Sequence, residues 1–197
     1  GLEVVSSHSM MPTAENRSEV VDMAGALGNA YHVCGRGRDR FATAEMCVET
    51  GREFQRAAEA LKGTGIQFGV HNHWWEFSNR FDGRSAHEIA MAEAPDAFAQ
   101  IDTYWAATGG ADTAEVIRSL GPRVPLLHIK DGPLDAKKSM TAVGDGRMDW
   151  KSVMAAVDES VLTWIIVEID RVDGNMLEAV ERSVKYLIDI GFGAGRG

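Results

Sequence analysis

The sequence contains little cysteine, fewer basic than acidic residues and no long apolar run. Its 197 residues include two cysteines, Cys34 and Cys47, which are too few for a disulfide framework or a metal knuckle. Such sparse usage predicts a reducing compartment, and hence a cytoplasmic protein. No apolar run approaches the length of a membrane-spanning helix, so no membrane is expected as a partner. The 20 Lys and Arg against 29 Asp and Glu give a net charge of −9, which argues against nucleic acid as a partner.

A nicotinamide cofactor is also not expected. The run Gly35-Arg36-Gly37 lacks the third glycine of a dinucleotide-binding fingerprint. The composition, 45% hydrophobic and 25% charged, is sufficient for a substantial core. No linker or low-complexity stretch interrupts the chain, which predicts a single domain over residues 1–190. The glycine-rich segment 191–197 is predicted to be a flexible tail.

Short apolar runs alternate with helix-like segments along the whole chain. The six runs lie at residues 2–8, 30–34, 66–70, 101–105, 126–131 and 165–170. The segments between and after them carry apolar residues at helical spacing. Strands that alternate with helices in this way predict a parallel sheet covered on both faces, and therefore an α/β fold.

Several helix starts can be predicted from capping residues. Asp112 and Asp149 each precede an apolar periodic segment, as an N-cap residue does. Thr13 is predicted to begin a helix after the first strand, although the capping-box Glu or Gln is missing three residues later. A longer helix is predicted over residues 43–61, with Met46 in its buried stripe.

Polar residues at the ends of the apolar runs give the strongest functional signal. The third run leads directly into His71, His73 and Glu76. If the strand continues, His71 and His73 share one face, and Glu76 lies just beyond in a loop. Buried strands rarely end in polar groups of this kind unless a site pairs them.

The same pattern recurs at the three later runs. Asp102 follows the apolar start of the fourth run, His128 and Lys130 follow that of the fifth, and Glu168 and Asp170 follow that of the sixth. Alone, Asp102 or Asp170 is more simply a turn former. For His128 and Lys130 a functional interpretation is favoured, because alternation places both on one face of a strand.

Other conspicuous residues have a simpler structural interpretation beside the functional one. His8 and His32 are predicted to satisfy local hydrogen bonds. Tyr104 and Trp105 are either core aromatics or part of a wall on which the apolar face of a sugar stacks. The run Gly144-Asp145-Gly146 is most simply a turn before the helix capped by Asp149.

Five motifs together carry a resemblance to a known family. They are GVHNHWWEF, IDTYWA, LLHIKDG, VGDGRMDW and IIVEID, in this order along the chain. The set resembles the sugar phosphate isomerase/epimerase family, a xylose-isomerase-like group of TIM barrels. The resemblance implies a (β/α)8 barrel, here truncated to about six βα units that correspond to strands three to eight. At roughly 30 residues per unit, about 60 residues upstream would supply the other two strands.

The resemblance also implies a site at the carboxyl ends of the strands. Family members hold one divalent metal, and the matching residues here are Glu76 (or His71), Asp102, His128 and Glu168. Three carboxylates and one imidazole suit Mn²⁺, Mg²⁺ or Co²⁺ better than structural zinc. The predicted catalytic residues are His73, Glu76 and Glu168, with His73 in proton transfer. The predicted substrate-binding residues are His71, Trp105, Lys130, Asp131 and Asp170.

The predicted activity is isomerisation or epimerisation of a sugar or sugar phosphate. The metal would polarise a carbonyl while a protein group removes the neighbouring C–H proton through an enediolate. A keto-sugar lyase or dehydratase would use the same step. Two alternatives remain: an endonuclease-IV-like nuclease, which the net charge disfavours, and a non-catalytic sugar-binding subunit. The predicted partner is a small sugar molecule, and homo-oligomerisation is left open.

Overall fold

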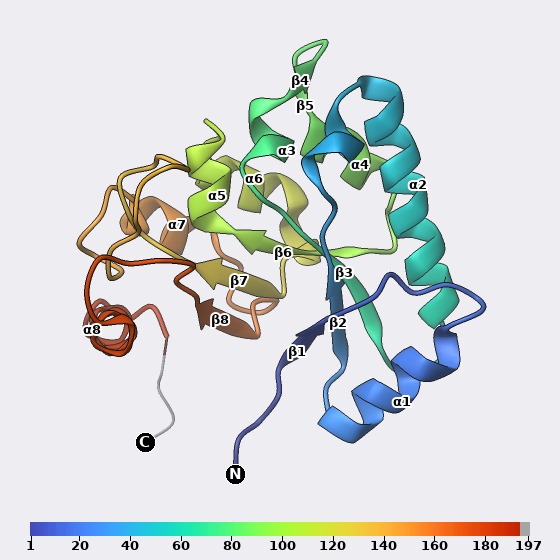
Figure 1. Cartoon of the computed structure of the whole chain (residues 1–197), viewed down its shortest axis with the longest axis horizontal. Coiled ribbons are helices and arrows are strands. Elements are labelled where there is room, and N and C mark those ends of the chain that lie inside the picture. Colours follow the sequence, from blue (N-terminus) through green and yellow to red (C-terminus); the bar gives the residue numbers. More distant parts are fainter. Residues whose placement is uncertain (194–197) are drawn as a thin grey trace. The chain divides into compact units, whose positions relative to one another are not determined.

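The computed structural model describes residues 1–193, in which strands alternate with helices along the chain (Figure 1). The chain divides into two compact units, Gly1–Gln100 and Ile101–Gly197. Strand β6 (Phe98–Asp102) contains the boundary between them.

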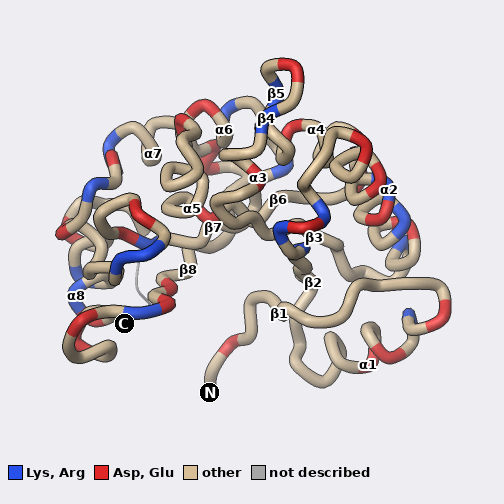
Figure 2. The backbone as a smooth tube through the Cα atoms, turned by 45° about the horizontal axis from the view of Figure 1, so that its top comes forward, with Lys and Arg blue, Asp and Glu red and all other residues tan. Residues whose placement is uncertain are grey.

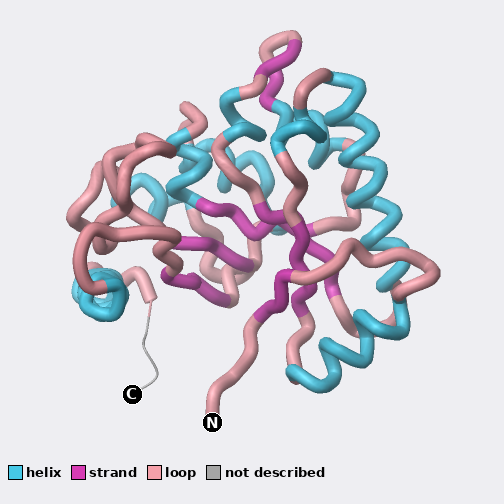
Figure 3. The backbone as a smooth tube through the Cα atoms, viewed as in Figure 1, coloured by secondary structure: helices cyan, strands magenta, loops and turns pink. Residues whose placement is uncertain are grey.

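The first unit is built on parallel strands, drawn in magenta in Figure 3. They are β1 (Ser6–His8), β2 (Tyr31–Cys34), β3 (Gln67–His71) and the first part of β6. Each strand pairs with the next one in this order, and the register places Val33 opposite Gly69 and Gly69 opposite Phe98. The parallel arrangement confirms the prediction from the alternating pattern.

Helices of the first unit follow its strands. They are α1 (Arg17–Leu27), the 3-10 helix η1 (Arg38–Phe41), α2 (Ala44–Leu61), α3 (Trp75–Ser78) and α4 (Ala86–Ala92). A small antiparallel hairpin, β4 (Arg80–Phe81) and β5 (Arg84–Ser85), projects between α3 and α4 (Figure 3). Helix α2 packs against both α4 and β3, and this places its buried face over the sheet.

The second unit contains the end of β6 and two further parallel strands. Strand β7 (Leu126–Ile129) pairs with β8 (Trp164–Val167), with His128 opposite Ile166. The helices are α5 (Thr103–Thr108), α6 (Thr113–Leu120), the 3-10 helix η2 (Gly121–Arg123), α7 (Trp150–Ala156) and α8 (Met176–Asp189). The described residues thus contain six parallel strands in succession, as the predicted set of βα units requires.

Three of the predicted helix starts are confirmed by capping hydrogen bonds. The side chain of Thr43 accepts from the backbone N–H of Met46 at the start of α2, at 3.2 Å. Asp112 caps α6 and Asp149 caps α7, each by accepting at 3.1 Å from a backbone N–H three residues on. Such a cap contributes about 1 kcal/mol by satisfying an otherwise unpaired donor.

Two details of the helix predictions were wrong. Helix α1 begins at Arg17 after Asn16, because Thr13 and Asn16 bond reciprocally and form a turn before the helix. Met46 is 47% exposed. The buried stripe of α2 starts one residue later, at Cys47, and the helix turns about 100° per residue, so Met46 faces away from it.

The bounds of several strands differ from the prediction, and one segment was missed. Strand β1 starts at Ser6 rather than at residue 2, and β8 ends at Val167 rather than at residue 170. Strand β6 is shifted, since it begins at Phe98 and ends at Asp102, three residues earlier than the predicted run. Helices α3 and α4 and the β4–β5 hairpin occupy the stretch between β3 and β6, for which no structure was predicted. The start of α4 is marked by a complete capping box, in which Ser85 and Glu88 satisfy each other's backbone N–H groups.

The predicted tail starts with an ordered turn. The backbone N–H of Phe192 donates to the carbonyl of Leu187 at 2.8 Å, and the Phe192 side chain is buried. The rest of the predicted tail, residues 194–197, lies outside the described residues.

Charged residues of both signs are interspersed on the helices, as α2 shows (Figure 2). Along α2, Arg52 pairs with Glu93 of the neighbouring loop, and Arg56 pairs with Glu49 of the same helix. None of the helices in the described part of the chain is long and apolar enough to cross a membrane.

Gly69 permits a close approach between β3 and β6. A Cβ atom added at this position would overlap the Phe98 ring, which is buried opposite it. We expect Gly69→Ala to lower the free energy of unfolding by about 1–3 kcal/mol, the usual cost of overpacking a core. Urea denaturation measures this loss.

The matched control is Gly25→Ala. Gly25 lies in α1 with open space where its Cβ would be, so alanine should be neutral or stabilise the helix by up to about 1 kcal/mol. Equal losses in the two variants would contradict the packing role of Gly69.

Candidate metal centre

The second unit brings together charged side chains from the ends of three strands. Asp102 is the last residue of β6, and its side chain is fully buried. It also caps α5, because its Oδ1 accepts from the backbone N–H of Trp105 at 2.9 Å. A strand that ends directly in a helix therefore fixes this carboxylate in position.

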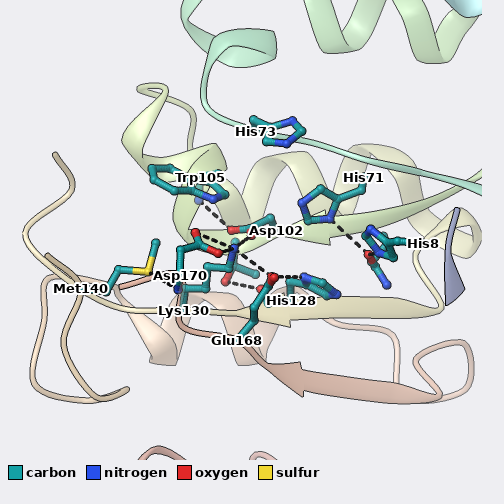
Figure 4. Close-up of polar contacts among 12 residues, drawn as sticks. His8, His71, His73, Asp102, Trp105, His128, Lys130, Met140, Glu168 and Asp170 are labelled. Carbon is teal, nitrogen blue, oxygen red and sulfur yellow. Dashed lines mark hydrogen bonds and ion pairs between the residues drawn. The ribbon is translucent and has the colours of Figure 1, made fainter. Parts of the chain in front are cut away.

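Lys130 lies at the centre of this group (Figure 4). It follows β7 and is 2% exposed. Its Nζ is 3.0 Å from Asp102 Oδ2, 2.9 Å from Glu168 Oε2 and 3.1 Å from both carboxylate oxygens of Asp170. We call these four residues the lysine cluster.

His128 joins the lysine cluster through Glu168. Its Nδ1 donates to Glu168 Oε2 at 2.6 Å, the same oxygen that Lys130 contacts. His128 and Lys130 therefore reach one carboxylate from alternate positions of one strand end, which confirms that they share a face. Glu168 and Asp170 lie beyond the end of β8, in the loop that follows it.

Burial and ion pairing act in opposite directions on these groups. Burial raises the pKa of Asp102 to about 6, against the opposing effect of Lys130. Burial alone would lower the pKa of Lys130, but Asp102, Glu168 and Asp170 outweigh it and raise that pKa. Burial alone would raise the pKa of Glu168, but hydrogen bonds from His128 and Lys130 hold it well below its usual range. Lys130 and Glu168 are therefore both charged at neutral pH.

The arrangement fits a divalent cation. One ligand atom each from Asp102, His128 and Glu168 lies within 4.8 Å of the other two, so a single ion can reach all three. Two carboxylates and an imidazole form a ligand set that Mn²⁺, Mg²⁺, Co²⁺ and Zn²⁺ accept. The fourth predicted ligand, Glu76 or His71, belongs to the first unit, and its role stays a prediction.

In the first unit, His73 and Glu76 form a pair. The strand β3 ends at His71, so His73 lies in a loop and Glu76 in the short helix α3, and neither is where the strand pattern placed it. Glu76 Oε1 accepts from His73 Nδ1 at 3.3 Å, and Oε2 accepts from the His73 backbone N–H at 2.9 Å. The His73 ring stacks on Trp75 at 4.1 Å. The position of the imidazole is thus held from two sides.

Glu76 is almost completely buried, and burial raises its pKa against the opposing effect of His73. A carboxylate that holds Nδ1 of an imidazole selects the tautomer and directs Nε2 outward for proton exchange. The contacts therefore suit His73 for the predicted proton transfer, with Glu76 as its partner.

Gln100 is a polar core residue that the sequence pattern did not single out. It is completely buried, and its Oε1 accepts from His8 Nε2 at 2.7 Å and from His71 Nδ1 at 3.1 Å. His8 was predicted to bond locally, but its partner is 92 residues away. Its spacing from Asp102 could have marked it as a candidate, because residues two apart on a strand face the same side.

Asp131 organises a loop rather than an open site. It is buried, and its carboxylate accepts four hydrogen bonds. The donors are the backbone N–H groups of Gly132, Gly144 and Met148 and the indole N–H of Trp150, at 2.8–3.1 Å. A Cβ atom at Gly146 would overlap this carboxylate. Its contacts assign Asp131 to the loop, and its predicted substrate binding stays a prediction.

Trp105 and Tyr104 lie on α5 and not on a strand. Tyr104 is fully buried, as expected for a core aromatic. Trp105 is partly exposed, and Lys130 Nζ lies 5.6 Å from its ring centroid, within cation–π range. Among the described residues of the second unit, the predicted site residues Asp102, Trp105, His128, Lys130, Glu168 and Asp170 are thus interconnected.

Comparison with known proteins identifies the family. A family model for the xylose isomerase-like TIM barrel matches residues 14–190. The chain belongs to this family. The sequence motifs, the six parallel strands and the position of the charged residues at strand ends agree with that assignment. A search of curated proteins gave no match.

Solved structures of similar fold include a sugar phosphate isomerase/epimerase from Parabacteroides distasonis. It has a TM-score of 0.76 and 27% identity over 98% of this chain and 72% of its own. A probable 3-DHS dehydratase, AsbF, from Bacillus anthracis has a TM-score of 0.71 and 12% identity, over 95% and 77% of the two chains. IolI protein with a zinc atom has a TM-score of 0.67 and 13% identity, over 94% and 75%. The last two show similarity of fold alone.

The role of Asp131 can be tested with an isosteric change. In Asp131→Asn, either orientation of the amide turns its NH2 group toward two N–H donors, so two hydrogen bonds are lost. We expect the free energy of unfolding to fall by about 3 kcal/mol or more, since bonds to a charged acceptor are strong and the donors stay buried. Urea denaturation measures the loss.

Asp145→Asn is the matched control from the same loop. Asp145 is half-exposed and pairs with Arg182 at the surface, so its loss should cost about 1 kcal/mol or less. If Asp131→Asn were as stable as Asp145→Asn, the four hydrogen bonds of Asp131 would not be what stabilises this loop.

Proposed function

We propose that the chain acts as a divalent-metal-dependent isomerase or epimerase of a sugar or sugar phosphate. The observation that carries the proposal is the convergence of Asp102, His128 and Glu168 within ligand distance of one another, in a chain of the xylose isomerase-like family. The similarity to a sugar phosphate isomerase/epimerase at 27% identity supports the same reaction class.

Asp102, His128 and Glu168 are the groups we assign to the metal. A divalent cation held by them supplies Lewis acidity toward a carbonyl or hydroxyl oxygen. Mn²⁺, Mg²⁺ and Co²⁺ are the ions proposed from the ligand types. The zinc atom in the IolI structure shows that one protein of this fold holds a metal ion.

His73 is the group we assign to proton transfer next to the carbonyl. Glu76 accepts hydrogen bonds from the Nδ1 and from the backbone N–H of His73, which fixes the ring and leaves Nε2 to exchange a proton. A base of this kind contributes about 10²–10⁴-fold to a rate. Glu168 is a second candidate acid or base, and His71, Trp105, Lys130 and Asp170 are proposed to bind substrate.

Solvent-deuterium incorporation tests the reaction class. The chain is incubated in D2O with a panel of keto-sugars and their phosphates, with Mn²⁺ or with a chelator, and the label is located by NMR. We expect label at the carbon next to the carbonyl only with metal. Loss of water from the substrate would instead indicate the dehydratase alternative, and sugar binding without any label would indicate a non-catalytic subunit.

Two variants separate the metal from the base. Asp102→Asn should lose metal and exchange together, because it removes one anionic ligand. His73→Ala should keep the metal and lose exchange by about 10²-fold or more. Full metal content and full exchange in Asp102→Asn would contradict the assignment of Asp102 as a metal ligand. If His73→Ala loses metal while Glu76→Ala retains it, His73 is a metal ligand and not the proton-transfer group.

A further inference from the structure

We propose that Lys130 is a built-in competitor of the divalent cation. In this proposal the Lys130 ammonium group pairs with the oxygens of Asp102 and Glu168 that the cation needs. When the cation binds, the ammonium group leaves these two carboxylates and pairs with Asp170 alone. The inference rests on the metal centre of the proposed function, and it concerns affinity for the ion rather than the reaction.

The first observation is that Lys130 and the candidate cation share ligands. Nζ lies 3.0 Å from Asp102 Oδ2 and 2.9 Å from Glu168 Oε2, and both side chains belong to the group of three that can hold an ion. Lys130 and Asp102 are buried, so water does not screen their attraction as it does at a surface. A cation can therefore bind these oxygens only against the attraction of Lys130.

The second observation is that an alternative partner stands beside Lys130. Both oxygens of Asp170 lie 3.1 Å from Nζ, yet Asp170 is not in the group of three ligand residues. Its side chain is 41% exposed. The Trp105 ring lies at 5.6 Å from the same ammonium. Lys130 can thus release Asp102 and Glu168 while it keeps an anionic partner and an aromatic face.

The net charge of the lysine cluster favours binding of the cation and movement of Lys130 toward Asp170. One ammonium group faces three carboxylates in the lysine cluster, so the cluster carries an excess of negative charge that favours a further cation. The two cations repel each other at short range, and the effect of each on the affinity of the other is reciprocal. Asp170 reduces that repulsion by drawing Lys130 toward itself.

Mn²⁺ affinities of four proteins test this account. The proteins are the wild-type chain, Lys130→Met, Asp170→Asn and the double variant, and free Mn²⁺ is measured by EPR without any substrate. Lys130→Met should bind Mn²⁺ roughly tenfold or more tightly, because a neighbouring positive charge is removed. Asp170→Asn should bind it more weakly than the wild type.

The double variant distinguishes ligand exchange from simple charge effects. If Lys130 moves to Asp170, then Asp170→Asn weakens binding strongly in the wild type and much less in the Lys130→Met background. Independent charge effects would be additive, with the same fold-change in both backgrounds, and this result would overturn the transfer to Asp170. Lys138→Met, an exposed lysine in the loop after β7, is the control and should leave the affinity unchanged.

The remaining outcomes are also decisive. Equal affinities in the wild type and Lys130→Met would overturn the competition while the metal centre stands. Binding of Mn²⁺ by none of the proteins would overturn the centre and this proposal together. Circular dichroism establishes that each variant folds. If Lys130→Met does not fold, an unchanged affinity in Asp170→Asn still overturns the proposal.

Discussion

A buried lysine among three carboxylates is the constraint on which the second unit depends. Lys130 and Asp102 are both removed from solvent, so neither charge is tolerable without the other. Breaking such a pair typically costs about 3–5 kcal/mol, because one charge remains buried alone. Since Asp102 ends β6, Lys130 follows β7 and Glu168 follows β8, the pairing holds three strand ends in a common arrangement.

Adjacent residues divide two tasks at the end of β7. Lys130 contacts the acidic groups of the candidate centre, whereas Asp131 accepts four hydrogen bonds from the following loop. Alternation along an extended chain separates their side chains onto opposite sides. One residue therefore organises the charges of the site, and the next fixes the loop beside it.

The strand ends could be predicted from the sequence because burial makes polar residues there conspicuous. Asp102, His128 and Glu168 each follow an apolar run, and the structure brings their ligand atoms together. The parallel fold was predictable for a similar reason, since the apolar runs alternate with capped helices. The order of the motifs then narrowed the fold to the xylose isomerase-like barrel, which the family match confirms.

Other features depend on contacts that no local pattern records. His73 was placed on a strand by alternation, but β3 ends at His71 because α3 begins soon after it. Gln100 lies just before the predicted fourth run, and its role is revealed by its contacts with the distant His8 and His71. Met46 is exposed while its neighbour Cys47 is buried, and this difference is set by which face of α2 packs against the rest of the unit.

Diffraction from crystals soaked in Mn²⁺, recorded near the manganese absorption edge, tests the central claim most directly. The account predicts an anomalous peak within about 2.0–2.6 Å of ligand atoms from Asp102, His128 and Glu168, with Lys130 bonded to Asp170 and no longer to Asp102. A peak elsewhere in the molecule, or no peak while Lys130 keeps all three carboxylates, would contradict it.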